Sequence, residues 1–178
     1  MRRFRLRVAL FLAFAALGCS QAVNVDQVFD DVDFTTFKTY AWMPRPEGDT
    51  GVPTGRQKYL EDALTKTIEQ QLAAKGFAKV SEGSDVLVGY WYGLADEEPR
   101  STDFTVDYTT SYSKREVWEG GGGVIRIDLV NPKTTRIVWR GRGEGAVNID
   151  PTPDMVEKNV DRAVTKIFTQ YPPTKPAG

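Results

Sequence analysis

The side chains that could carry out chemistry in this chain are carboxylates, because the chain has no histidine and a single cysteine, Cys19. Ser-His-Asp and Cys-His catalysis, histidine metal sites and imidazole acid-base chemistry are therefore excluded. Aspartates and glutamates can still ligate a hard cation or act as an acid pair. Spacing alone does not show that two carboxylates face each other in a cleft, so an acid-pair hydrolase is the least favoured alternative.

Two groups of carboxylates are dense enough to consider as cation sites. They are Asp26, Asp30, Asp31 and Asp33, and then Asp96, Glu97 and Glu98. Neither group has the spacing of an EF-hand calcium loop, so we interpret both as solvated loops and predict no metal ion and no cofactor. The glycine run 120–123 lies between predicted strands and not before a helix, which favours a hairpin loop over a phosphate-binding loop.

Arginines and acids alternate on two predicted strands near the end of the chain. They are Arg126, Arg136, Arg140 and Arg142, with Asp128 and Glu144. This set could bind an anion, but cross-strand ion pairing on a solvated face is the favoured interpretation.

Aromatic residues are concentrated in two segments that we predict to be extended. They are Tyr90, Trp91, Tyr92, Phe104, Tyr108, Tyr112 and Trp118. Such rings could line a groove for a glycan or a lipid, although aromatic residues in strands usually belong to the core. The possible binding surface comprises Tyr90, Trp91, Tyr92 and Trp118.

The first eighteen residues have the pattern of an export signal. Four arginines precede an apolar run from Val8 to Gly18, which at eleven residues is shorter than the roughly 20 needed to span a bilayer. The run ends at Cys19, which as the only cysteine cannot form an internal disulfide. The segment 15–20 resembles the lipobox of bacterial lipoproteins, with Ala16 where leucine is usual. We predict a signal peptide over 1–18 and a lipidated anchor over 19–22; the alternative is an ordinary signal peptide that contains a cysteine.

The charge of the remaining chain argues against nucleic acid as a partner. The full chain has 23 basic and 24 acidic side chains, and loss of the four signal arginines changes the formal charge from -1 to 19 - 24 = -5. Nucleic acids are bound through clusters of lysine and arginine. Residues 19–178 contain no such block.

The elements that must position these residues follow from hydrophobic periodicity. Apolar residues at helical spacing predict amphipathic helices over 56–75 and from Pro153 to Phe168, with Gly76 ending the first and Thr152 capping the second. Strands are predicted near 23–28, 33–42, 77–80, 84–93 and 104–118, and as a hairpin over 125–140. The fold class is therefore α+β, with an antiparallel or mixed sheet and both helices packed on one face. We expect one domain over 23–171 and a flexible tail over 172–178.

The predicted elements carry a series of short segments in a characteristic order. They are Val23–Asp26, Asp33–Trp42, Ala74–Phe77, Asp85–Val88, Ile127–Val130 and Val138–Gly141. In this order they resemble a bacterial envelope lipoprotein family, domain of unknown function 4136. The resemblance implies an exported, commonly lipidated α+β domain with no assigned activity, cofactor or catalytic residue.

These observations favour a lipid-anchored, non-catalytic module of the cell envelope. We expect it to contact the membrane through its lipid and to bind an envelope protein or a cell-wall component. By analogy with the family, serine rather than aspartate at position 20 implies the outer membrane, facing the periplasm. The alternative is a periplasmic carrier of a small lipid or glycan.

Overall fold

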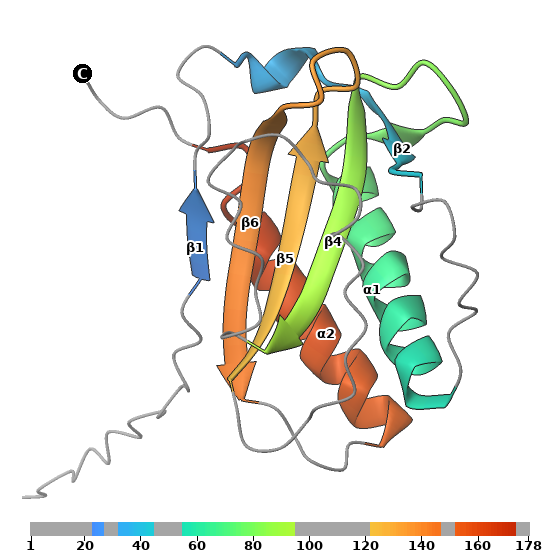
Figure 1. Cartoon of the computed structure of the whole chain (residues 1–178), viewed down its shortest axis with the longest axis vertical. Helices are drawn as coiled ribbons and strands as arrows, with labels where there is room; N and C mark the ends of the chain where they lie inside the picture. Colours follow the sequence, from blue (N-terminus) through green and yellow to red (C-terminus); the bar gives the residue numbers. More distant parts are fainter. Residues whose placement is uncertain (1–22, 27–31, 45–54, 95–121, 147–151, 174–178) are drawn as a thin grey trace, which may run out of the picture.

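The computed structural model describes residues 23–26, 32–44, 55–94, 122–146 and 152–173, and these form a six-stranded mixed sheet with two helices (Figure 1). The strands are β1 (Val23–Asp26), β2 (Thr39–Trp42), β3 (Ala78–Lys79), β4 (Val86–Leu94), β5 (Gly122–Val130) and β6 (Ile137–Ala146). A short 3-10 helix, η1 (Phe34–Thr36), precedes β2, and the two long helices are α1 (Gly55–Ala74) and α2 (Pro153–Phe168). None of the described helices is long and apolar enough to span a bilayer.

The sheet has the order β1-β6-β5-β4-β2-β3. Strands β4, β5 and β6 are antiparallel neighbours, and β1 adds antiparallel to β6. Strand β2 instead runs parallel to both β4 and β3, which makes the sheet mixed. The predicted fold class and the interior position of β4 are confirmed.

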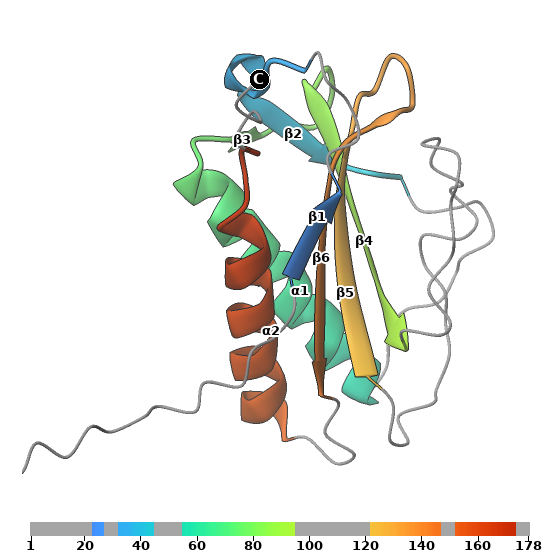
Figure 2. The same ribbon diagram turned by 90° about the vertical axis from the view of Figure 1, so that its left-hand side faces the viewer.

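Both long helices cover the same face of the sheet, as predicted (Figure 2). The main core lies between the layers and includes the fully buried Leu64, Ile68, Trp139, Ile167 and Phe168. Helix α2 approaches β6 closely because Gly141 has no side chain: a Cβ there would lie 2.4 Å from Cγ2 of Ile167. Overpacking of this kind in a core typically costs ~1–3 kcal/mol.

The predicted ends of the helices are confirmed in detail. Thr152 is the N-cap of α2, and its hydroxyl accepts a hydrogen bond from the backbone N–H of Met155 at 3.4 Å. Gly76, directly after α1, has a φ of 88°, a left-handed conformation that glycine adopts without steric cost. The local sequence therefore sets where both helices stop or start.

The opposite face of the sheet differs from the prediction, because the hairpin of β5 and β6 has no fully solvated face. Arg126 and Asp128, which we expected on that face, are only 4% and 6% exposed. Burial is tolerated because Asp128 pairs with both Arg126 and Arg140. Beside these charges a second small apolar cluster forms from Met43, Val130 and Ile137.

The predicted strand over 104–118 lies outside the described residues. So do the predicted signal peptide, the anchor and most of the tail.

Candidate binding groove beside helix α1

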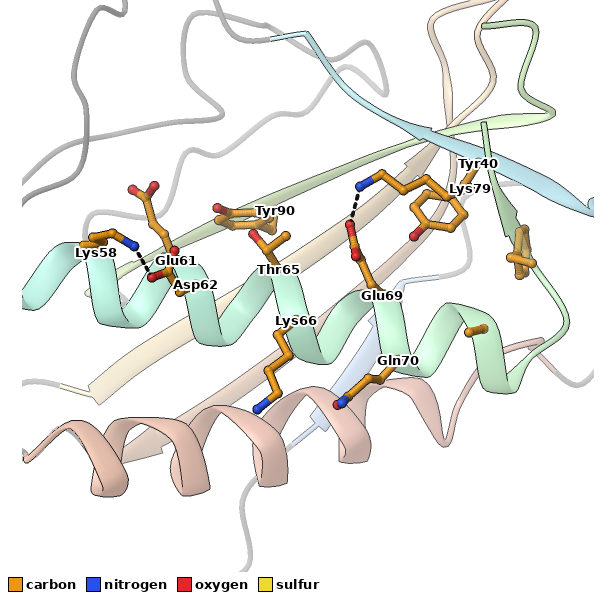
Figure 3. Close-up of a pocket in the computed structure, with 12 residues that line it drawn as sticks. Tyr40, Lys58, Glu61, Asp62, Thr65, Lys66, Glu69, Gln70, Lys79 and Tyr90 are labelled. Atoms are coloured by element: carbon orange, nitrogen blue, oxygen red, sulfur yellow. Dashed lines mark hydrogen bonds and ion pairs between the residues drawn. The ribbon is translucent and has the colours of Figure 1, made fainter. Parts of the chain in front are cut away.

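A groove of about 790 Å³ runs along α1, with its floor toward the sheet and with Lys66 and Gln70 of its lining pointing toward α2 (Figure 3). Helix α1 forms one wall, and the edge strand β3 together with β2 and β4 forms the other. Two rows of α1 side chains line it, each with a spacing of four residues that places its members on one side of a helix. The rows are Lys58, Asp62, Lys66 and Gln70, and then Glu61, Thr65, Glu69 and Ala73.

Two tyrosines from the sheet form the floor of the groove. Tyr40 of β2 and Tyr90 of β4 are 3% and 7% exposed, so they offer little ring area to a ligand. Burial raises the pKa of Tyr40, and the nearby charge of Glu69 raises it further. The floor is therefore apolar and neutral, and the polar groups of the groove come mainly from α1 above it.

The aromatic rings on the sheet side of the groove contact one another in a continuous row. Trp42 stands edge-on to Tyr40 and to Tyr90, with centroids 6.3 and 5.9 Å apart, and Tyr90 stacks on Tyr92 at 6.4 Å. Aromatic pairs at such separations stabilise each other beyond their buried area. Together they form a rigid sheet-side wall.

Glu69 is the most constrained polar group in the groove. Its Oε1 accepts hydrogen bonds from the indole of Trp42 at 2.9 Å and from the ammonium of Lys79 at 2.6 Å. Burial alone would raise the pKa of Glu69, but the hydrogen bonds from Lys79 and Trp42 together lower it. Glu69 is therefore held ionised across the middle of the groove.

The remaining charges of the groove also have protein partners. Glu61 accepts a hydrogen bond from the hydroxyl of Tyr92 at 3.0 Å, and Lys58 pairs with Asp62 one turn along α1. Lys66 turns toward α2 and pairs with Glu157 at 2.5 Å (Figure 3). The groove thus combines a neutral floor with a rim of positioned, mutually compensated charges.

The structure separates the residues that we predicted as a binding surface. Tyr90 lines the groove and Tyr92 adjoins it, whereas Trp91 is 2% exposed on the opposite face of the sheet. Successive side chains of a strand alternate between its faces, and this rule applied to positions 90–92 would have separated Trp91. Trp118 and Cys19 lie outside the described residues.

Sequence reasoning missed the α1 side of the groove. The polar residues of α1 at positions 58–73 looked like an ordinary solvated helix face. A signal was present in their four-residue spacing, but it gives no indication that an edge of the sheet faces them. That information exists only in the strand order, which puts β2 and β3 beyond β4.

The other candidate sites have structural roles where they are described. Asp33 caps η1 and accepts hydrogen bonds from the Thr35 hydroxyl at 2.6 Å and the Thr35 N–H at 3.0 Å, and these lower its pKa. Among the described residues no group of three or more possible metal-ligating side chains occurs. Asp30, Asp31, Asp96, Glu97 and Glu98 lie outside the described residues.

The arginines on β5 and β6 form ion pairs, one of them across the hairpin as predicted, but Asp128 is buried and not on a solvated face. Arg140 donates two hydrogen bonds to the carboxylate of Asp128, its register partner across the hairpin, at 2.7 and 3.0 Å. Arg142 pairs with Glu144 at 2.6 Å on the same strand. Arg136 is exposed, near the hairpin turn and ahead of β6.

Comparison with known protein families shows which family this chain belongs to. A family described as a domain of unknown function, DUF4136, matches residues 23–173. The chain belongs to this family. The family match spans all the described elements, from β1 through α2, and carries no activity with it. No curated protein is detectably similar to the chain in sequence.

Solved structures show likeness at the level of the fold. A PDZ domain protein from Parabacteroides distasonis is 19% identical with a TM-score of 0.54, covering 86% of this chain and 36% of that one. The DUF4136 chain therefore spans about a third of that protein's length. The PelC dodecamer from Paraburkholderia phytofirmans is 7% identical with a TM-score of 0.43, covering 84% of this chain and 96% of that one.

Proposed function

We propose that this DUF4136 protein is a non-catalytic binding module that is tethered by lipid to the cell envelope. The groove beside α1 is the observation that carries the proposal, and it is the place where a partner binds. The tether is Cys19, four positions before the start of β1, whose thiol is alkylated by a diacylglyceryl group that lies in the outer membrane, with the domain facing the periplasm.

Two properties of the groove support binding: its volume and the fixed positions of its charged side chains. Its volume of about 790 Å³ lies within the roughly 300–1,000 Å³ typical of ligand sites. The carboxylates of Glu61 and Glu69 and the ammonium of Lys66 are already positioned by Tyr92, Lys79 and Glu157. A partner would therefore immobilise few side chains on binding, which lowers the entropic cost of association.

The protonation of Glu69 supports a non-catalytic role. In an acid-pair hydrolase one carboxyl group must have a raised pKa so that it holds a proton near neutral pH. The pKa of Glu69 is lowered instead, because Lys79 and Trp42 stabilise its ionised form against the effect of burial. This carboxylate is suited to accepting hydrogen bonds from a partner.

Photo-crosslinking in intact cells tests the groove as a partner site. A crosslinking residue replaces Gln70, which lines the groove and is exposed, in the full-length protein. The matched control carries it at Glu82, which is exposed in the turn after β3, outside the groove lining. We expect a discrete adduct with an envelope protein from position 70 and none from position 82.

The carrier alternative gives a different result in the same experiment. Loss of any adduct at position 70, together with a lipid or glycan that co-purifies with the protein, would contradict the binding module and support a carrier. Identical adduct patterns from both positions would show that the groove has no special role.

A further inference from the structure

Three basic residues of α2 lie in one row along the helix. Lys158, Arg162 and Lys166 recur every four residues and so form one row along its surface. They lie two positions after Val156, Val160 and Val164, the buried row that faces the sheet. Two positions correspond to about 200° around a helix, so the basic row points away from the sheet, on the outside of the helix layer.

Two acidic residues of α2 lie on the side toward α1, whereas Asp154 in the first turn continues the basic row one turn before Lys158. Glu157 pairs with Lys66 of α1 and is the main cause of the raised pKa of Lys66. Asp161, one turn later on α2, also raises this pKa, by a smaller amount. Thr165 in the same row accepts a hydrogen bond from Gln71 of α1 at 3.0 Å. The outer row carries three basic groups and the carboxylate of Asp154, so its formal charge is 3 - 1 = +2.

An apolar side chain accompanies this basic row. Met155 stands seven residues before Arg162, about two helical turns, and is therefore on the same face. It is 39% exposed, and Tyr59 on α1 is 54% exposed; these are the exposed large apolar side chains among the described residues. A basic helix face with an apolar residue suits a bilayer surface, where phosphates meet acyl chains.

The position of Cys19 brings a membrane to this face. Three residues separate Cys19 from Val23, and the four Cα-to-Cα steps between them span at most about 14 Å in an extended chain. Helix α2 packs against β1 as well as β6, and Figure 2 views the molecule from the β1 side. Since a helix is about 10 Å across, the outer face of α2 is within reach of the surface that holds the anchor.

We propose that the outer face of α2 docks on the phosphate-bearing headgroups of the membrane that holds the lipid of Cys19. Lys158, Arg162 and Lys166 contact the phosphates, and Met155 enters the boundary between headgroups and acyl chains. The proposal rests on the tether proposed above and adds an orientation to it. In this orientation the part of the groove between α1 and the strands β2, β3 and β4 stays open to the periplasm.

Energy transfer to labelled headgroups in vesicles tests the orientation. The full acylated protein is reconstituted in phosphatidylcholine with and without phosphatidylglycerol. Because Cys19 is the only cysteine and is acylated, Asn159→Cys provides one thiol for a fluorophore beside the basic row, and Lys133→Cys provides one at the β5–β6 turn. We expect stronger transfer from position 159, most of all with phosphatidylglycerol.

Charge reversal separates docking from tethering. Lys158→Glu with Arg162→Glu should reduce transfer from position 159 several-fold toward the value at position 133, as should high salt. The control pair Lys38→Glu and Lys133→Glu should leave it unchanged, with circular dichroism confirming that both folds are intact. If the protein floats with the vesicles but energy transfer is equal from positions 159 and 133, the docking of α2 is contradicted and the tether is not. Failure of the wild-type protein to float would overturn the tether, and docking with it.

Discussion

Asp85 shows how a single carboxylate joins two strands that meet in parallel. Its Oδ2 accepts hydrogen bonds from the backbone N–H of Lys38 at 2.9 Å and from the N–H and hydroxyl of Thr39, both at 2.8 Å. The N–H of Asp85 in turn donates to the hydroxyl of Thr39 at 3.0 Å. These contacts hold β2 in the register that pairs Tyr40 with Val86 of β4, and in this register the ring of Trp42 contacts both Tyr40 and Tyr90.

The ionised form of Asp85 should contribute stability only above acidic pH. The hydrogen bonds from Lys38 and Thr39 lower the pKa of Asp85, so the folded state binds its proton less readily than the unfolded chain does. The contribution is present above the unfolded pKa of about 4 and is lost as the pH falls through the folded value. Asp85→Asn replaces charge-assisted hydrogen bonds with weaker neutral ones and should lower the free energy of unfolding by about 1 kcal/mol at pH 7.

Urea unfolding of both proteins from pH 7 down to pH 3 measures this effect. The difference between wild type and Asp85→Asn should shrink as the pH falls below about 4. A difference that stays constant with pH would show that the charge of Asp85 has no part in holding β2 to β4.

Tyr171 is a second residue whose chemistry gives a test. Its ring packs against Trp139, Phe34 and Phe77, and burial raises its pKa to about 12. The hydroxyl is buried and has no hydrogen-bond partner within the described part of the chain. Tyr171→Phe removes this unpaired group and should raise the free energy of unfolding by about 1 kcal/mol.

The control for this change removes the whole ring. Tyr171→Ala should lower the free energy of unfolding by about 3–5 kcal/mol, because it leaves a cavity among three aromatic side chains. If Tyr171→Phe is destabilising instead, the hydroxyl has a partner and the present account of this core position is wrong.

At the scale of elements, α2 offers a direct comparison of its two faces. Val160 is 3% exposed on the buried row, and Lys158 is exposed on the outer face. Burying an unpaired charge costs several kcal/mol, comparable with the ~5–15 kcal/mol that stabilises a whole domain. Val160→Asp should therefore give a largely unfolded protein, while Lys158→Asp should change the melting temperature little. Similar melting temperatures for the two variants would contradict the assigned faces.

Local sequence patterns predicted most elements correctly because their causes are local. The stripe around Val160, the cap at Thr152 and the glycine at position 76 each act within a few residues of their own helix. The parallel pairing of β2 with β4 depends on contacts such as that between Asp85 and Thr39, which are far apart in the chain. No pattern within either strand reveals it.

The candidate site was harder to predict for the same reason. Tyr90 was selected for its ring, but Tyr40 and Glu69 come from other elements, and only the folded sheet brings the three together. The charged residues of β5 led to a different error, because they were predicted to be exposed and are buried. Arg126 and Asp128 alternate like residues of a solvated face, yet mutual pairing makes their burial possible.

At the scale of the whole molecule, the groove and the outer face of α2 lie on different sides of the helix layer. The groove opens between α1 and the β2–β3 edge of the sheet, and the basic row faces outward from α2. A domain held by lipid and docked through α2 would leave the groove accessible from the periplasm. The proposed tether at Cys19 would connect these two features into one function.

Labelling of living cells with a fatty-acid probe tests the tether most directly. The full-length wild-type protein should take up the probe and fractionate with the membrane, because acyl chains contribute about 0.8 kcal/mol per buried methylene. Ser20→Ala, which keeps the cysteine, should be labelled equally well. Cys19→Ala should carry no label and leave the membrane fraction. Equal labelling of wild type and Cys19→Ala, or no labelling of either, would contradict the account.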